Sequence, residues 1–128
     1  MEDTIQARKI EIVDSAGKVR AILGTRIPET GQPAEEGPVL SFLTPAGREL
    51  VRFELEDNGR EGGGYSPLVY MQSDDGQIAL EANCMNGGAM LRVGEIQGDR
   101  HALIAVTDES VRMETNPRQE QAIEEKAA

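Results

Sequence analysis

Apolar residues recur at fixed distances from four glycines, Gly17, Gly47, Gly76 and Gly98. The positions seven and five residues before each glycine, and four and six residues after it, are apolar in all four copies. A step of two within each arm is the period of a β-strand, whose alternate side chains point to one face. The pattern predicts four strand–turn–strand repeats with sixteen largely buried column residues: Ile10, Ile12, Ala21, Leu23, Leu40, Phe42, Val51, Phe53, Val69, Met71, Leu80, Ala82, Leu91, Val93, Ala102 and Ile104.

The segments that end in these glycines have the composition of tight turns. Residues 14–17 read Asp-Ser-Ala-Gly, 44–47 Thr-Pro-Ala-Gly and 73–76 Ser-Asp-Asp-Gly, while 95–98, Glu-Ile-Gln-Gly, is less typical. Short polar side chains bond their own backbone, and glycine adopts a positive φ without strain, as a tight hairpin requires. A calcium loop would need alternating oxygen ligands and a distal Glu, which 73–76 lacks. We therefore expect hairpin turns at or within two residues of each glycine rather than metal binding.

The connections between repeats vary more than the hairpins. Residues 24–37 contain two prolines and an acidic pair, and 57–67 contain three consecutive glycines, so we expect both to be exposed, mobile loops. Residues 106–113 predict the end of one strand, a turn and a short final strand. We expect one all-β domain over 1–115, in which four antiparallel β-hairpin repeats form a meander, sandwich or barrel that oligomerisation could complete. The polar residues 116–128 predict a tail that is disordered or forms a short, frayed helix.

The first repeat resembles a unit found in bacterial β-hairpin repeat proteins. Its form is apolar-x-apolar-x-Asp-x-x-Gly-Lys-x-Arg-Ala-x-Leu-Gly, which the chain matches from Ile10 to Gly24. The second repeat keeps the spacing but has Thr44 in place of Asp, and the third and fourth keep mainly the apolar columns. The resemblance covers roughly residues 7–106 and implies a β-repeat architecture. It implies no established activity, cofactor or catalytic residue.

Composition limits the core and the partners. Of 128 residues, 38% are apolar and 28% charged, a globular mixture that suits one domain. The chain has no Trp and only two Tyr and two Phe, so Val, Ile, Leu, Met and Ala must build a thin core. Its net charge of −10 disfavours nucleic acid and anionic membranes as partners. The opening Met-Glu-Asp predicts no signal peptide, and we expect a cytoplasmic or virion-associated assembly protein.

The residues capable of chemistry have no partners at recognisable spacings. His101 is the only histidine and is expected to face solvent or a rim. Cys84 is the only cysteine and follows the apolar arm of the third repeat, where the other repeats have Thr25, Leu55 and Val106, so a packed thiol is expected rather than a nucleophile. Glu54 and Glu56 share one strand face with Arg52 and could form a general acid–base pair, but a solvated outer face has the same pattern. We expect no catalytic, metal-binding or cofactor-binding residues, and therefore no enzyme.

Apolar runs at 39–43, 68–71 and 103–106 leave few positions for water on either face of their strands. A chain this small cannot cover both faces alone, so we expect a non-enzymatic structural or assembly protein that is a homo-oligomer, with a trimer preferred to a dimer. Another protein could also be its partner. The interface residues expected from these runs are Leu68, Tyr70, Val39, Leu43 and Leu103.

The alternative function is a binding module for a small molecule or a glycan. It would use the loops 24–37 and 57–67 on a rigid β scaffold. Glycan sites usually contain stacking aromatic side chains, and only Tyr65 and Tyr70 lie near a loop. The sequence therefore favours the assembly protein.

Overall fold

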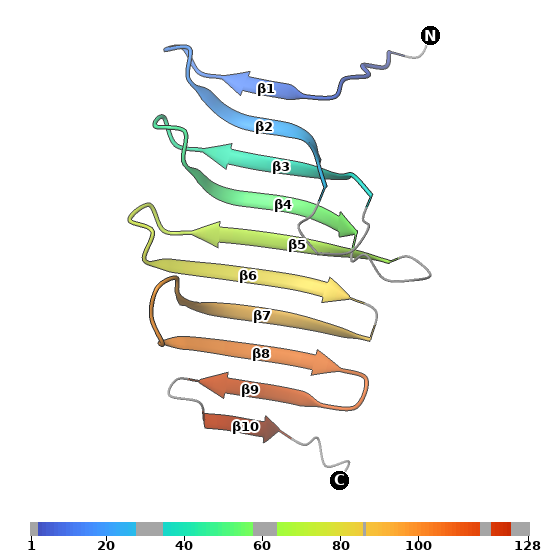
Figure 1. Ribbon diagram of the computed structural model, residues 1–128, viewed down its shortest axis with the longest axis vertical. Helices are drawn as coiled ribbons and strands as arrows, with labels where there is room; N and C mark the ends of the chain where they lie inside the picture. The colour runs from blue at the N-terminus through green and yellow to red at the C-terminus, as the bar shows by residue number, and fades with distance from the viewer. Residues whose placement is uncertain (1–2, 28–34, 58–63, 86, 116–118, 124–128) are drawn as a thin grey trace.

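The computed structural model describes residues 3–27, 35–57, 64–85, 87–115 and 119–123. Over these residues the chain forms one antiparallel sheet of ten strands whose spatial order follows the sequence (Figure 1). The strands are β1 (Ile10–Val13), β2 (Val19–Arg26), β3 (Gly37–Leu43), β4 (Glu49–Asp57), β5 (Tyr65–Gln72), β6 (Ile78–Met85), β7 (Gly88–Glu95), β8 (His101–Thr107), β9 (Val111–Thr115) and β10 (Gln119–Ile123).

The all-β fold class predicted from the sequence is confirmed, and of the three predicted arrangements the chain adopts the meander. β1 and β10 lie at opposite ends of the sheet, so the sheet does not close into a barrel (Figure 1). The strands on either side of each connection between repeats also pair antiparallel as neighbours, so each of these strand pairs is a hairpin. The predicted short final strand is β9.

The tail forms one more strand than the sequence predicted. Residues Gln119–Ile123 pair antiparallel with β9, and Ile123 lies opposite Val111. The prediction of a disordered or helical tail is therefore wrong over these five residues. The physical reason is that β9 would otherwise end the sheet with unpaired N–H and C=O groups, which a following segment can satisfy. Residues 116–118 and 124–128 lie outside the described part of the chain.

The hairpins turn where the glycines predict. Gly17 donates its backbone N–H to the Asp14 carbonyl oxygen at 3.0 Å, and the same bond spans 44–47 and 73–76 at 2.9 Å each. Gly17, Gly47 and Gly76 have φ between 72° and 87°, a conformation that glycine adopts without strain. The turn at 95–98 is built differently. Its Glu95 N–H donates to the Arg100 carbonyl oxygen at 2.8 Å, as the Ser73 N–H does to that of Ile78, but Gly98 is not among the glycines with a positive φ. Its less typical sequence accompanies this difference.

Strand pairing aligns the sixteen columns into two rows that run across the sheet. One row joins Ile12, Ala21, Phe42, Val51, Met71, Leu80, Val93 and Ala102; the other joins Ile10, Leu23, Leu40, Phe53, Val69, Ala82, Leu91 and Ile104. Because positions two apart on a strand share a face, both rows lie on the same side of the sheet. We call this side the apolar face and the opposite side the polar face.

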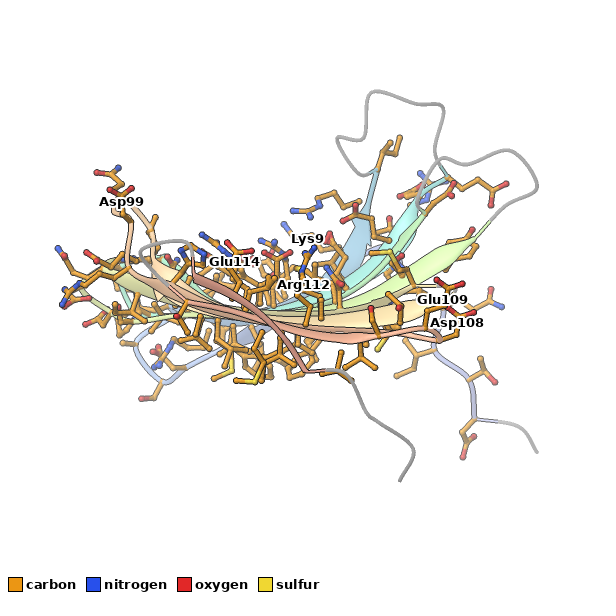
Figure 2. All side chains as sticks on the ribbon, turned by 90° about the horizontal axis from the view of Figure 1, so that it is seen from below. Lys9, Asp99, Asp108, Glu109, Arg112 and Glu114 are labelled. Atoms are coloured by element: carbon orange, nitrogen blue, oxygen red, sulfur yellow. The ribbon has the colours of Figure 1, made fainter. Side chains whose placement is uncertain are left out.

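The apolar face is not covered by any other part of the described chain. Ala21, at 7% exposure, is the only buried hydrophobic residue among those described, whereas Phe42 and Phe53 are 43% and 44% exposed. In Figure 2 polar side chains, including Lys9, Arg112 and Glu114, project from one side of the sheet, and mostly carbon and sulfur lie on the other. The prediction that the sixteen columns are largely buried is therefore wrong for the single chain, because the sheet is one layer thick.

Candidate functional site: an uncovered apolar sheet face

The apolar face is wider than the two rows of columns. A third row flanks them towards the end of the sheet where β2, β4, β6 and β8 finish, and it contains Thr25, Pro38, Leu55, Pro67, Cys84, Ala89, Val106 and Val111. None of the residues in the three rows is charged. The face carries an open hollow of about 620 Å³, lined mostly by apolar residues from β2 to β8, with Glu54 and Asn83 also in its lining. A continuous apolar surface of this extent on a water-facing sheet is typical of an interaction surface.

The polar face holds an ion-pair network centred on Glu54. Glu54 is 7% exposed and pairs with Arg26 of β2, and the Arg52 guanidinium lies 3.6 Å from its carboxylate. Arg52 also pairs with Glu49 at 2.7 Å and lies over the Tyr70 ring, 5.0 Å from the ring centroid. Glu49, Arg52 and Glu54 belong to β4, whereas Arg26 belongs to β2 and Tyr70 to β5, so the network ties these three strands together.

This network corrects the expected environment of the acidic pair on β4. A solvated outer face was predicted for Glu54 and Glu56, but Glu54 is buried and Glu56 is half-buried. Arg26, which lies 28 residues from Glu54 in sequence, supplies the charge that makes burial of this carboxylate tolerable. A carboxylate fixed between two guanidinium groups serves to hold strands together. Glu54 therefore lies in an ion-pair network and not on a solvated outer face.

Arginines also link successive hairpins. Arg20 Nε of β2 donates to the Leu43 carbonyl oxygen at 3.0 Å, and Arg48 donates to the carbonyl oxygens of Ser73 and Asp74. In each case a side chain from one hairpin reaches the turn of the next. Arginine is suited to this because its donors fan out in a fixed plane.

The turn carboxylates are held in their charged form. The pKa of Asp14 is lowered by the backbone N–H of Lys18 and further by that of Ala16 and by Arg20. The pKa of Asp75 is lowered by the Ser73 hydroxyl and the Gln77 N–H, and that of Glu95 by the guanidinium of Arg100. These hydrogen bonds close the turns, so the charged carboxylates stabilise the fold.

The lone histidine and cysteine lie on opposite faces. His101 is half-buried on the polar face, with Nε2 3.1 Å from Glu114 and Nδ1 3.0 Å from the Asp99 carbonyl oxygen. Cys84 lies in the third row of the apolar face and is exposed in the single chain, so the predicted packed thiol is not found there. The described residues contain no group of three or more His, Cys, Asp or Glu placed to hold a metal ion.

The five interface residues predicted from apolar runs do not lie on the apolar face. Val39, Leu68, Tyr70 and Leu103 are half-buried on the polar face, and Leu43 follows a bulge at the end of β3. A run of consecutive apolar residues supplies both faces of a strand in alternation. The other residues of these runs, such as Leu40, Val69 and Ile104, lie in the two apolar rows and are among the sixteen column residues.

The alternative loop site falls largely outside the described residues, since 28–34 and 58–63 are not described. The ends of these loops are joined: the Glu35 N–H donates to Asp57 Oδ2 at 2.6 Å, and the Tyr65 hydroxyl donates to Glu35 Oε2 at 2.9 Å. This carboxylate raises the pKa of Tyr65. The loops are therefore anchored side by side at their bases.

Comparison with known proteins returns no match among protein families, curated proteins or solved structures. In the described residues there is no helix with the length and apolar character needed to cross a membrane.

Proposed function

We propose that the protein is a non-enzymatic structural module that functions as a homo-oligomer. The observation that supports this most strongly is the single-layer sheet, in which Ala21 is the only described hydrophobic residue that is buried. Stable domains bury the apolar face of a sheet against a second layer. The described part of this chain supplies no such layer, so a neighbouring chain is the natural source.

The chemistry of the described side chains is consistent with a structural role. Glu54, Arg52 and Arg26 join strands, and Asp14 and Asp75 close turns. His101 pairs with Glu114 rather than with a nucleophile. The net charge of −10 favours solubility of assembled particles and disfavours nucleic acid and anionic lipid as partners.

Light scattering coupled to size exclusion tests this function. The chain has a mass of 13.9 kDa, and we expect at least twice that mass in solution, with three times the mass for a trimer. A particle of 13.9 kDa at tens of micromolar, with no dependence on concentration, would contradict the proposal.

A second candidate is a binding module for a small apolar molecule, favoured by the hollow of about 620 Å³ on the apolar face. This site differs from the loops 24–37 and 57–67 proposed from the sequence. A glycan is a poorer fit to the hollow, because its lining offers few polar groups. A ligand screen by thermal shift on the monomer would test this function if light scattering finds no oligomer.

A further inference from the structure

The three rows of the apolar face form one surface that is complementary to the same surface on a second copy of the chain. Resting on the proposed function, we propose that copies of this chain meet through this face. The apolar face of each copy covers that of a second copy, and the polar faces stay in water. Two copies arranged in this way would give each chain the second layer that it lacks.

The distribution of charge supports a second copy as the occupant. The chain carries 23 acidic and 13 basic residues, yet the three rows contain none of them. Two chains of net charge −10 can therefore meet on the three rows without burying row residues of like charge, and the Glu36 carboxylate, which accepts from the Thr25 hydroxyl, lies at the end of the third row. On the polar face the same approach would bring Glu54, Glu81 and Glu114 towards the partner's carboxylates.

The area of the face is sufficient for a stable interface. Each row crosses eight strands, which at about 4.8 Å apart extend over about 34 Å, and three rows with their side chains span about 20 Å. Covering a surface of that size buries about 670 Å² on each copy, or about 1,300 Å² in total, within the range of specific, stable interfaces. The interface would be obligate, because the single chain has almost no core of its own.

The shape of the face also favours a sheet over a small ligand. The apolar lining runs from β2 to β8, or about 29 Å at the usual strand spacing, which one small molecule cannot cover. A second sheet presents side-chain rows at the same strand spacing, so the two sets of side chains can interdigitate as in a β-sandwich. The repeated columns thus provide the same packing surface on every copy.

Cys84 provides a built-in probe of this arrangement, because it lies on the apolar face and is exposed in the single chain. If a second copy covers the face, the Cys84 thiol of the native protein should react with a disulfide reagent at least about ten-fold more slowly than the same thiol in denatured protein. The matched control is Arg92→Cys in a Cys84→Ser background, because Arg92 is exposed on the polar face of the neighbouring strand. Its thiol should react freely in the native protein. Equal, fast reaction of both thiols would overturn the inference.

A pair of identical substitutions then locates the interface. Leu91 of β7 belongs to the apolar face, and Leu103 of the adjacent strand β8 lies on the polar face. Leu91→Gln should raise the dissociation constant of the oligomer by about ten-fold or more, because a buried polar amide would lack a partner. Leu103→Gln should leave the mass by light scattering unchanged.

The possible outcomes separate this inference from the proposed function. Dissociation by Leu103→Gln but not by Leu91→Gln would overturn the apolar-face interface while leaving the homo-oligomer in place. A wild-type mass of one chain would overturn both proposals. If Leu91→Gln fails to fold, the reactivity of Cys84 in the wild-type protein still decides the question.

Discussion

Truncating Phe53 tests whether the apolar face is covered in solution. Its ring is 44% exposed in the single chain and packs edge-to-face with Phe42, with ring centroids 6.3 Å apart and planes at 82°. Full burial of such a side chain stabilises a protein by about 1.5–3 kcal/mol, so a half-covered ring contributes about 1–1.5 kcal/mol. A ring enclosed by a second layer also leaves a cavity when it is removed, and Phe→Ala then costs about 3–5 kcal/mol.

We therefore expect Phe53→Ala to lower the free energy of unfolding by about 3–5 kcal/mol per chain. The assay is urea denaturation at several protein concentrations, because the stability of an oligomer depends on concentration. The wild-type midpoint should rise with concentration. A loss of about 1.5 kcal/mol or less, with a midpoint independent of concentration, would mean that Phe53 stays half-exposed and that no second layer covers it.

Three further predictions concern the turns, the acid stability and the metal content. Gly47→Ala should lower the free energy of unfolding by about 1–2 kcal/mol, because Gly47 has φ 87°, a conformation that alanine rarely adopts. Gly24→Ala should leave that free energy nearly unchanged, because its added methyl makes only an ordinary van der Waals contact. Thermal denaturation measures both changes. The lowered pKa values of Asp14 and Asp75 stabilise the fold above their ordinary value of 3.8, and this contribution is lost as the pH falls through the lowered values. Relative to Asp99→Asn, which makes the same charge change in another turn, Asp14→Asn should be less stable by chemical denaturation at pH 7, and the gap should close below pH 3.8. Elemental analysis should find no stoichiometric transition metal, and a bound metal that is lost on His101→Ala would contradict the assignment of His101 as a partner of Glu114.

Local features of the fold were predictable because they depend on neighbouring residues. The period of two and the turn glycines define the strands and place the hairpins at Gly17, Gly47, Gly76 and Gly98. The same columns predict a shared face, which the strand register confirms. What the columns could not reveal is whether a covering layer comes from the same chain. An apolar residue in a single-layer sheet and one in a sandwich have the same sequence pattern.

The candidate site was harder to predict, because it depends on contacts between residues that are distant in sequence. The burial of Glu54 depends on Arg26, on a strand two places away in the sheet. The five interface residues were chosen from unbroken apolar runs, but alternation along a strand divides each run between the two faces. Leu68 and Val69 are neighbours in sequence and lie on opposite faces. The strand at Gln119–Ile123 was missed because its sequence is mostly polar and it forms by pairing with the edge strand β9.

Contacts between the apolar faces of different copies can be observed directly by isotope-filtered NMR. One population would carry labelled methyl groups on Ile, Leu, Val and Met, and would be mixed, unfolded and refolded with an unlabelled population. The apolar-face interface predicts intermolecular nuclear Overhauser effects from the methyl groups of Leu91, Ile104 and Val69. Intermolecular effects confined to polar-face methyl groups such as those of Leu68 and Leu103, or their complete absence, would contradict it.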